Sequence, residues 1–419
     1  MQLKKKSRIN GALAMAATAL LGGEVVAEDK GWEVDASLLY YSEDDRVDAT
    51  EPTINATKTF ADGSKLNLHF VADTLTGASP NGAAPSDVPQ TFTRPSGNGS
   101  FVVAPGEIPL DDTFKDSRAQ FGVGWEAPIS RVMRYNVGVN VSSEYDYESV
   151  AVSAGLARDF NKKNTTLSFG VAFEADTLSP EGDIPTPLAS MATAGSPQPR
   201  DGSSETKDVV DVVLGITQVI NAQTVMKFNV GTSQSSGYLN DPFKIVSVVD
   251  VNGRAVDYIY ENRDDSRTKK YLYWSTQYHT PWEDTVDFSF RYMTDDWGID
   301  SQTIDLRYRW NVSPRLYVQP HLRLYTQSEA DFYRHSLSQA EAIPQEVSAD
   351  YRLAEFDATS IGLKVGYALS SSSEISVRFE TYQQRGDTSP SGAIGVQQQY
   401  DMFPDLDASF LQVTYSLNF

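Results

Sequence analysis

The sequence lacks cysteine, has few basic residues for its length and contains only one apolar run long enough to be a candidate targeting or membrane segment. Its 419 residues include no Cys, and 35 Lys and Arg stand against 56 Asp and Glu, for a formal net charge of −21. Without cysteine there can be no disulfide framework, thiolate metal site, thioether-linked haem or lipidated N-terminal Cys. The acidic balance argues against a nucleic-acid binder, because phosphate binding needs clustered Lys and Arg.

The single apolar run lies at the N-terminus. A helical membrane protein of this size would need several apolar runs of about 20 residues, so that class is excluded. Residues 1–27 contain a basic stretch that ends at Arg8, an apolar stretch over 11–23 and small residues up to Ala27. This layout predicts a signal peptide cleaved after Ala27. The less favoured alternative is an N-terminal membrane anchor, against which the length counts, since about 13 apolar residues are too few to cross the bilayer core. We expect the mature chain, residues 28–419, to be exported.

The C-terminal segment ASFLQVTYSLNF alternates strictly between apolar and polar residues. Alternation that ends on a C-terminal Phe is typical of the closing strand of an outer-membrane barrel, with one face toward lipid and the other toward the lumen. An ordinary half-buried strand could show the alternation alone, but soluble chains usually end in a polar tail. We interpret the apolar set as an assembly signature that the barrel-assembly machinery reads: Leu411, Val413, Tyr415, Leu417 and Phe419.

The same alternation recurs along the chain, and two kinds of connection separate its segments. Tight turns are expected near 61–64, 127–131, 160–164, 220–223, 280–284, 313–315 and 370–373. The intervening connections include long ones over 74–116, 177–206, 236–268, 328–353 and 386–407. Outer-membrane barrels have short periplasmic turns and longer extracellular loops. The sequence therefore predicts an all-β, transmembrane, antiparallel up-and-down barrel of about 16 strands, or 14 if the hairpin over 46–73 is extracellular.

A soluble β-sandwich, propeller or β-helix is the competing interpretation of many short strands. It does not explain why short and long connections alternate, and the sequence shows no internal repeat of fixed period. The placement of tryptophan also favours a membrane protein. Trp32, Trp125, Trp282 and Trp310 fall near predicted periplasmic strand ends, where interfacial aromatic residues gather.

The polar face of the predicted strands over 285–326 carries a concentrated set of charges that we expect to line the lumen. Two functions are open: an electrostatic lining that orients or selects a solute, as charged rings do in pores, or a salt-bridged ladder that stiffens the wall. Residues near the closing strand extend the array. The lumen-lining candidates are Arg291, Arg307, Arg309, Arg323, Arg378, Asp287, Asp305 and Glu380, with His321 and Tyr325 among them.

Other predicted inward positions are small, among them Gly124, Gly155 and Gly362. Small inward residues are expected to leave volume for water, an inserted loop or a partner. The long loop 74–116, which is rich in Gly, Pro, Ser and Asn, is the candidate plug or constriction. The alternative for such a composition is a mobile surface loop.

Catalytic and metal-binding motifs are scarce. The sequence has four scattered His and no HExxH or Gly-x-Ser-x-Gly pattern. His335, in an external loop with Asp331 nearby, is the one candidate base for a hydrolase at the outer rim. Acid pairs at or near loops, such as Asp111-Asp112 and Asp295-Asp296, could bind Ca²⁺ through carboxylate oxygens. None matches the EF-hand spacing, and we favour solvated or lipopolysaccharide-bridging groups. No cofactor or metal is predicted.

Long motifs across nearly the whole mature chain resemble one bacterial family. They include DTLTGASPNGA at 73–83, SSGYLNDPFKIVSVVD at 235–250, PHLRLYTQSEADFY at 320–333 and ADYRLAEFDA at 349–358. On these motifs the chain is similar to the outer-membrane proteins grouped as domain of unknown function 3570. The resemblance implies a barrel fold and supplies no catalytic residues. The family's usual company of exported redox and flavin-attachment proteins implies a role beside extracytoplasmic electron or metal chemistry.

These observations predict a non-enzymatic barrel in the Gram-negative outer membrane that forms a porin-like passage. One alternative is a scaffold or sheath barrel that docks a periplasmic redox or metal-handling partner. A rim-located hydrolase that uses His335 is the other. The expected surroundings are outer-membrane lipid and lipopolysaccharide, with no nucleic acid.

Overall fold

The computed structural model describes residues 31–44 and 46–419, so the predicted signal peptide lies outside the described residues. The described chain forms a closed barrel of 16 strands, every one of which pairs antiparallel with its neighbours. Both strands of the uncertain hairpin, β2 (Val47–Thr59) and β3 (Lys65–Pro80), belong to the wall. The prediction of 16 strands is therefore confirmed, and the alternative of 14 is wrong.

The other barrel strands follow in chain order. They are β1 (Trp32–Glu43), β6 (Leu110–Ser130), β7 (Met133–Glu144), β8 (Tyr147–Phe160), β9 (Thr165–Leu178), β12 (Glu205–Asn221), β13 (Thr224–Gly237), β16 (Ser266–His279), β17 (Thr285–Asp295), β18 (Asp300–Ser313), β19 (Leu316–Gln327), β21 (Phe356–Ala368), β22 (Ser373–Gly386) and β23 (Leu406–Asn418). Three short 3-10 helices are η1 (Asn161–Lys163), η2 (Tyr351–Leu353) and η3 (Gly395–Gln399). The part of the chain that the structure describes includes no helix long and apolar enough to cross a membrane.

The strands form because apolar and polar residues alternate with period two, so each strand presents one face outward and one inward. Large apolar side chains occupy the outer face and are exposed there. On β7, Val137, Val139 and Val141 are 45%, 49% and 42% exposed. A soluble protein would not expose so extensive an apolar surface. The outer face is therefore the lipid-facing surface of a membrane-spanning barrel.

The barrel closes by pairing its first and last strands. Leu38 on β1 lies opposite Val413 on β23, and Val34 lies opposite Leu417. The terminal Phe419 donates its backbone N–H to the carbonyl of Trp32 at 2.9 Å and accepts from the Trp32 N–H at 2.5 Å. The C-terminal apolar set thus points to lipid along the seam, and the last residue is held by the first strand.

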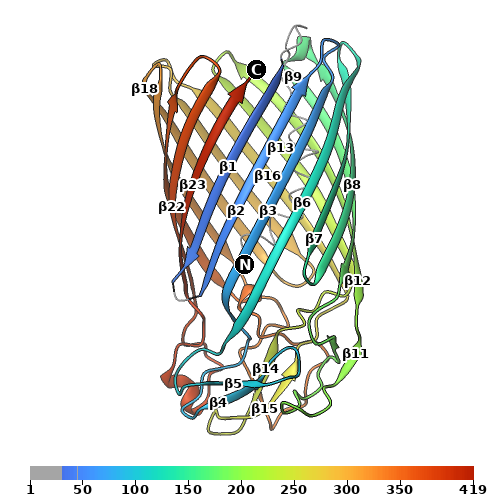
Figure 1. Cartoon of the computed structure of the whole chain (residues 1–419), viewed down its shortest axis with the longest axis vertical. Coiled ribbons are helices and arrows are strands. Elements are labelled where there is room, and N and C mark those ends of the chain that lie inside the picture. The colour runs from blue at the N-terminus through green and yellow to red at the C-terminus, as the bar shows by residue number, and fades with distance from the viewer. Residues whose placement is uncertain (1–30, 45) are drawn as a thin grey trace.

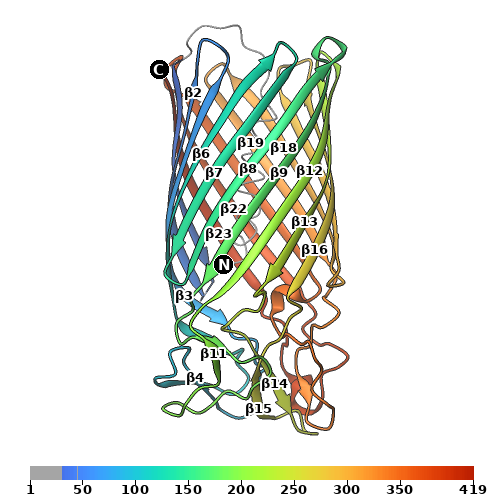
Figure 2. The same ribbon diagram turned by 90° about the vertical axis from the view of Figure 1, so that its right-hand side faces the viewer.

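Short and long connections alternate around the barrel, as the sequence predicts. Seven connections, at the end of the barrel where the C-terminus lies, are tight turns, such as the one between Ser130 and Met133. Figures 1 and 2 show these turns at the end of the barrel where the C-terminus lies, while the long loops gather at the opposite end. Trp282 and Trp310 lie at the short-turn end, where an interfacial aromatic belt is expected.

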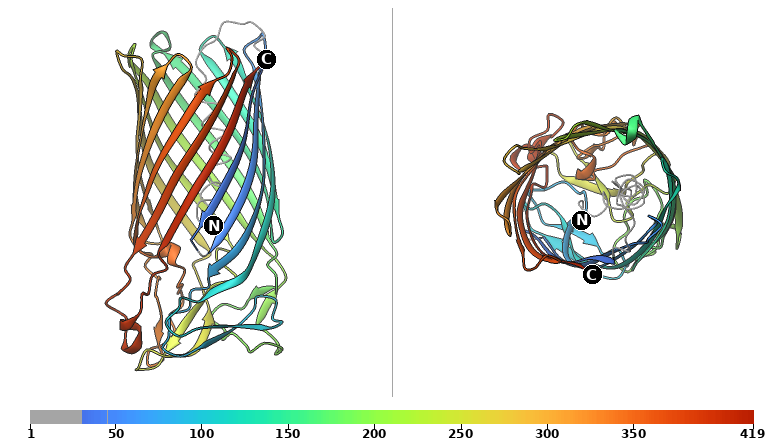
Figure 3. Two further views of the ribbon diagram at one scale, coloured as in Figure 1. Left: turned by 60° about the vertical axis from the view of Figure 1, so that its left-hand side comes forward. Right: turned by 90° about the horizontal axis from the view of Figure 1, so that it is seen from above.

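Five long loops fold together into what we call the cap, made of residues 81–109, 179–204, 238–265, 328–355 and 387–405. The cap contains three small sheets, formed by β4 (Gln90–Thr93) with β5 (Ser100–Val103), β10 (Ile184–Pro185) with β11 (Arg200–Gly202), and β14 (Ile245–Val249) with β15 (Ala255–Tyr260) and β20 (Leu337–Ser338). The cap projects beyond the wall (Figure 1), and its segments cross the far opening when the barrel is viewed from above (Figure 3, right).

The cap has its own hydrophobic core. Val246, Ile259 and Val347, which come from two different loops, pack in one buried cluster, and Phe92 packs against Tyr258 with ring centroids 4.9 Å apart. Burial of these side chains explains why loops with many Gly and Pro residues take a fixed arrangement. The mouth of the barrel is therefore covered by a folded structure built from several loops.

The predicted loop 74–116 needs a correction. Strand β3 continues to Pro80 and β6 begins at Leu110, so the two ends of that segment are barrel wall. The remainder, 81–109, is part of the cap, where Phe92 is only 1% exposed. Phe92 and Val103 pack against Ile245 and Tyr260 of a neighbouring loop at the mouth, and the role of this segment as a plug or constriction stays a prediction.

Candidate functional site

The inward face of β17 to β23 carries the basic side chains that the sequence predicts for the lumen. Strand pairing places them in rows across the wall. Gln319 on β19 lies opposite Lys364 on β21, Lys364 lies opposite Arg378 on β22, and Arg378 lies opposite Gln412 on β23. Because paired residues share a face of the sheet, these four polar side chains form one row that faces the lumen.

A chain of alternating charges crosses the neighbouring row. Arg307 lies 3.4 Å from Asp305, whose other contact is His321 Nε2 at 3.0 Å. His321 Nδ1 lies 2.9 Å from Glu380 Oε1, and the same oxygen lies 3.4 Å from Arg378 Nη1. Both ring nitrogens of His321 therefore face carboxylates, which only accept hydrogen bonds when ionised. The arrangement ties β18, β19 and β22 together inside the barrel.

Gly362 on β21 is what lets this chain reach across an intervening strand. His321 pairs with Gly362, and Gly362 pairs with Glu380. A Cβ at position 362 would lie 2.2 Å from Glu380 Cγ, so any larger residue would displace the carboxylate. Gly155 is filled in the same way by Asn136. The expectation that small inward residues leave free volume is wrong at Gly155 and Gly362, because neighbouring side chains occupy the space, whereas a Cβ at Gly124 would meet only ordinary contacts.

The basic wall encloses a recess of about 240 Å³ that opens to the lumen. All of its lining side chains are polar: Asp287, Arg307, Gln319, His321, Lys364, Ser376, Arg378, Glu380, Gln412 and Thr414. Beside it lies the ring of Tyr317, which covers Gly366 and donates its hydroxyl to Glu374 at 2.7 Å. Arg309 stacks on the same ring, with its guanidinium carbon 3.6 Å from the centroid.

Five of the eight predicted lumen residues gather at this recess and its charged chain: Asp287, Asp305, Arg307, Arg378 and Glu380. The other three do not line the recess or join the charged chain. Arg309 stacks on Tyr317, Arg291 lies 5.1 Å from the ring centroid of Tyr271, and Arg323 is paired in register with Asp305. The site prediction missed Lys364 and the two glutamines, although the alternation of β21 places Lys364 inward.

The opposite side of the lumen is acidic. Glu174 and Asp176 on β9 and Asp211 on β12 are all buried, and Lys207 Nζ contacts Asp176 at 2.7 Å. Farther round, Asp73 accepts from Arg118 Nε at 2.7 Å. In the ring of strands β7 is fifth and β19 thirteenth of sixteen, which makes them diametrically opposite. The lumen therefore has an acidic side centred on β3 to β12 and a basic side centred on β17 to β22.

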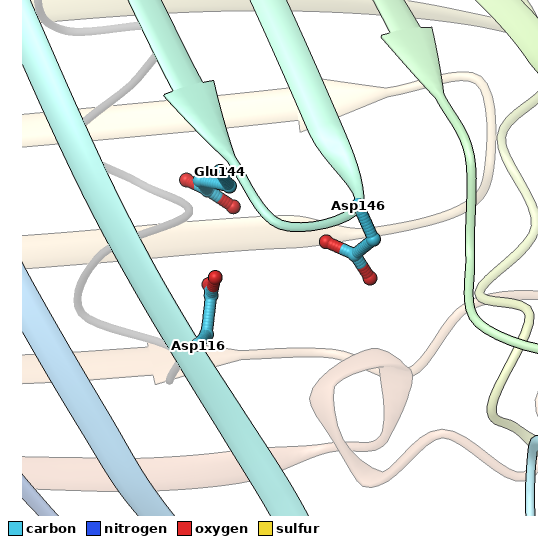
Figure 4. A group of neighbouring side chains, drawn as sticks. All are labelled: Asp116, Glu144 and Asp146. Atoms are coloured by element: carbon cyan, nitrogen blue, oxygen red, sulfur yellow. The ribbon is translucent and has the colours of Figure 1, made fainter.

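A second recess, of about 160 Å³, lies between the cap and the acidic wall. Its lining includes Asp116 on β6, Glu144 at the end of β7 and Asp146 in the following turn, which point toward one another (Figure 4). One carboxylate oxygen from each lies within 4.8 Å of the others. Hard cations such as Ca²⁺ take ligands of this kind. Each of the three residues also has further interactions within the protein, so the trio is a feature of the acidic mouth and no metal is assigned to it.

A buried ionic network fastens the cap. Arg352 bonds to both Asp350 and Asp241, and Arg263 bonds to Asp350 at 2.8 Å and to Glu261 at 3.0 Å. Lys244 donates to the carbonyl of Pro80, the last residue of β3, at 2.5 Å. The network thus joins two cap loops to each other and to the barrel wall. Asp241 and Lys244 lie within the motif at 235–250, Asp350 and Arg352 lie within the motif at 349–358, and Glu261 and Arg263 lie in the segment 260–269.

The pKa values in this network follow from burial and pairing. Burial alone would raise the pKa of Asp350, but Arg352 and Arg263 outweigh it and hold the pKa below its usual range. Burial raises the pKa of Glu261, against an opposing effect of Arg263. Burial also lowers the pKa of Lys244. Removing one partner of a buried ion pair lowers the free energy of unfolding strongly, because the other charge is left buried and unpaired.

His335, the candidate base of a rim hydrolase, forms no hydrogen bond or ion pair with Asp331 in the part of the chain that the structure describes. It lies in the cap beside Gly392, and burial lowers its pKa. The Asp331 carboxylate instead packs close to Gly298. Among the described residues, the buried Nε2 of His335 has no hydrogen-bond partner. The geometry that a rim hydrolase would need is absent at this histidine.

Comparison with known proteins gives a family and a set of distant barrels. A family model described as "Protein of unknown function (DUF3570)" matches residues 10–417, whereas no curated protein matches the sequence. The CymD monoaromatic hydrocarbon channel is 8% identical with a TM-score of 0.43, over 98% of this chain and 93% of that one. The siderophore receptor PirA from Acinetobacter baumannii is 8% identical with a TM-score of 0.42, over 86% of this chain and 54% of that one. OccK2 (OpdF) of Pseudomonas aeruginosa, solved with glucuronate, is 11% identical with a TM-score of 0.39, over 94% of this chain and 100% of that one. At identities this low, none of these likenesses assigns a function.

Proposed function

The chain belongs to the DUF3570 family of proteins of unknown function, and we propose that it forms a capped passage for small polar solutes across the outer membrane. The observation that carries the proposal is the contrast between the two faces of one wall. The outer face is apolar and exposed, whereas the inner face between β17 and β23 holds a wholly polar recess of about 240 Å³. A wall that served only to stiffen the barrel would not need such a recess.

The opposed walls define what the passage favours. The acidic side and the basic side produce an electric field directed across the lumen, and low-dielectric walls strengthen that field. A polar solute that enters would turn its negative groups toward Arg307, Lys364 and Arg378. Charged side-chain linings select solutes in pores in this way. The passage requires no catalytic residue.

The cap sets the size limit. Solutes would pass between the cap and the acidic wall, where the recess of about 160 Å³ lies next to Glu144 and Tyr147. Because the cap has its own core and a buried ionic network, we propose that it acts as a fixed filter. Because outer-membrane barrels have long extracellular loops and short periplasmic turns, we place the cap outside the cell and the short turns in the periplasm.

Liposome swelling tests the passage. Liposomes that contain the full-length barrel should swell in isosmotic arabinose faster than empty liposomes and faster than in isosmotic raffinose. Thr414 faces the lumen and Val413 faces lipid, so Thr414→Trp should slow the swelling while Val413→Trp should not. Swelling no faster than that of empty liposomes, with insertion shown by protease protection, would exclude a passage.

The sheath hypothesis, in which the barrel docks a periplasmic redox or metal-handling partner, stays a prediction. A detergent pull-down that recovers a stoichiometric partner would support it. The same holds for the signal peptide and its cleavage after Ala27, which N-terminal sequencing of the exported protein would establish.

A further inference from the structure

We propose that the recess on the basic wall is a binding site for a small oxyanion, a carboxylate or phosphate group carried by the solute. The inference rests on the proposed passage and names the solute class that it favours. Two cations form the centre of the site: Lys364 and Arg378 are paired directly across β21 and β22. Both side chains line the recess.

The two cations have donor capacity that the protein leaves unused. Arg378 places Nη1 3.4 Å from Glu380, and its side chain is 35% exposed where it lines the recess. Among the described residues Lys364 has no hydrogen-bond or ion-pair partner, and its nearest aromatic contact is the Tyr317 ring, with the centroid 5.8 Å from Nζ. A partly exposed guanidinium beside an ammonium group suits an oxyanion, whose oxygens accept several charge-assisted hydrogen bonds.

Neutral donors flank the cations on both sides. Gln319 lies opposite Lys364 on one neighbouring strand, and Gln412 lies opposite Arg378 on the other. The row therefore runs glutamine, lysine, arginine, glutamine across four strands. Amide groups at each end can bond the polar remainder of a solute, which gives the site more than a single point of charge.

The nearby carboxylates are engaged by groups other than Lys364. Glu380 accepts from His321 at 2.9 Å and also faces Arg378, and Asp305 is shared by His321 and Arg307. Three permanent cations, Arg307, Lys364 and Arg378, thus stand with three carboxylates, Asp287, Asp305 and Glu380, and Lys364 is the cation that has no ion-pair partner among the described residues. Asp287 also lines the recess and pairs in register with Arg307.

Titration calorimetry of the full-length protein in detergent tests the site, with sodium phosphate and sodium succinate as probes and glycerol as the neutral control. Wild type should bind at least one of the two anions and should not bind glycerol. The double variant Lys364→Gln/Arg378→Gln should weaken that binding by about tenfold or more. Arg315→Gln removes one positive charge at an exposed position at the short-turn end and should leave the affinity unchanged.

Gln319→Leu/Gln412→Leu provides a second variant that keeps every charge, and it should also weaken binding. Binding of phosphate alone would assign a phosphate-bearing solute, and binding of succinate alone would assign a carboxylate. Absence of binding by wild type, or equal affinity in the Lys364/Arg378 variant, would overturn the site. If arabinose swelling persisted in that case, the passage would stand without the site. Anion binding without swelling would leave the site standing and remove the passage.

Discussion

His321 and Glu380 are joined across a strand that belongs to neither of them. His321 lies on β19 and Glu380 on β22, yet Nδ1 and Oε1 are 2.9 Å apart, because Gly362 on the intervening β21 leaves the path between them open. The contact continues to Asp305 on β18. Three side chains thereby link four strands of the wall and fix the shape of the recess beside them.

Gly362→Ala should break this link. The added Cβ would lie 2.2 Å from Glu380 Cγ, so the Glu380 side chain must move and its hydrogen bond to His321 is lost. We expect a loss of about 1.5–3 kcal/mol in the free energy of unfolding, the usual range for a hydrogen bond to a charged group. Denaturant unfolding in detergent measures it. Gly124→Ala is the matched control, since its Cβ would meet Asn67 Cβ at an ordinary 3.6 Å. Equal effects in the two variants would contradict the account.

Arg352→Leu should loosen the cap. The substitution leaves Asp350 and Asp241 without their shared partner, and Asp350 is only 1% exposed. Removing one member of a buried ion pair costs about 3–5 kcal/mol. Limited proteolysis should therefore cut the loops 238–265 and 328–355 much faster than in wild type. Arg254→Leu is the control, because its ion pair with Asp87 lies on the cap surface. Unchanged proteolysis of the Arg352 variant would show that the network does not hold the cap.

Acidification should open the cap through Asp350. Its pKa is lowered in the folded protein, so the carboxylate contributes stability that is fully present above its unfolded pKa of about 4 and is lost as the pH falls below that value. Acid-stable protease should cleave the cap loops at pH 3 far faster than at pH 6. In Asp350→Asn the loops should already be cleaved readily at pH 6, with little further change on acidification. A wild-type cap that stays resistant at pH 3 would oppose this role.

The orientation of the barrel can be measured directly because the chain has no native cysteine. Val251 is exposed in the turn between β14 and β15 of the cap, and Ser371 is exposed in the tight turn between β21 and β22. A membrane-impermeant maleimide added to intact cells should label Val251→Cys and should leave Ser371→Cys unlabelled until the cells are broken. The reverse pattern would invert the proposed orientation.

Much of the barrel could be predicted from the sequence because period-two alternation is a local signal. Leu411, Val413 and Tyr415 face lipid as that pattern predicts, and the alternation of turns and loops gives 16 strands. The same rule places Arg307 and Arg378 inward. Applied to β21, it also places Lys364 inward, so this residue of the site was within reach of the sequence.

Period-two alternation could not predict the cap, nor could it predict that neighbouring side chains occupy the space at Gly155 and Gly362. The cap core joins residues far apart in the chain, such as Val246 and Val347, in segments without any repeating pattern. The space at Gly362 depends on Glu380, a side chain from the next strand, whereas composition shows only that the glycine is small. Long-range packing of this kind leaves no periodic trace in the sequence.

The central claim, that the barrel is a passage whose basic wall meets the solute, is tested most directly by current recording from the purified protein in planar lipid bilayers. Wild type should give stepwise conductance in KCl, and millimolar succinate or phosphate should reduce the current. Lys364→Gln/Arg378→Gln should conduct but should need about tenfold more of the blocking anion. Protein that is shown to be inserted yet conducts no current above the bare bilayer would contradict the account.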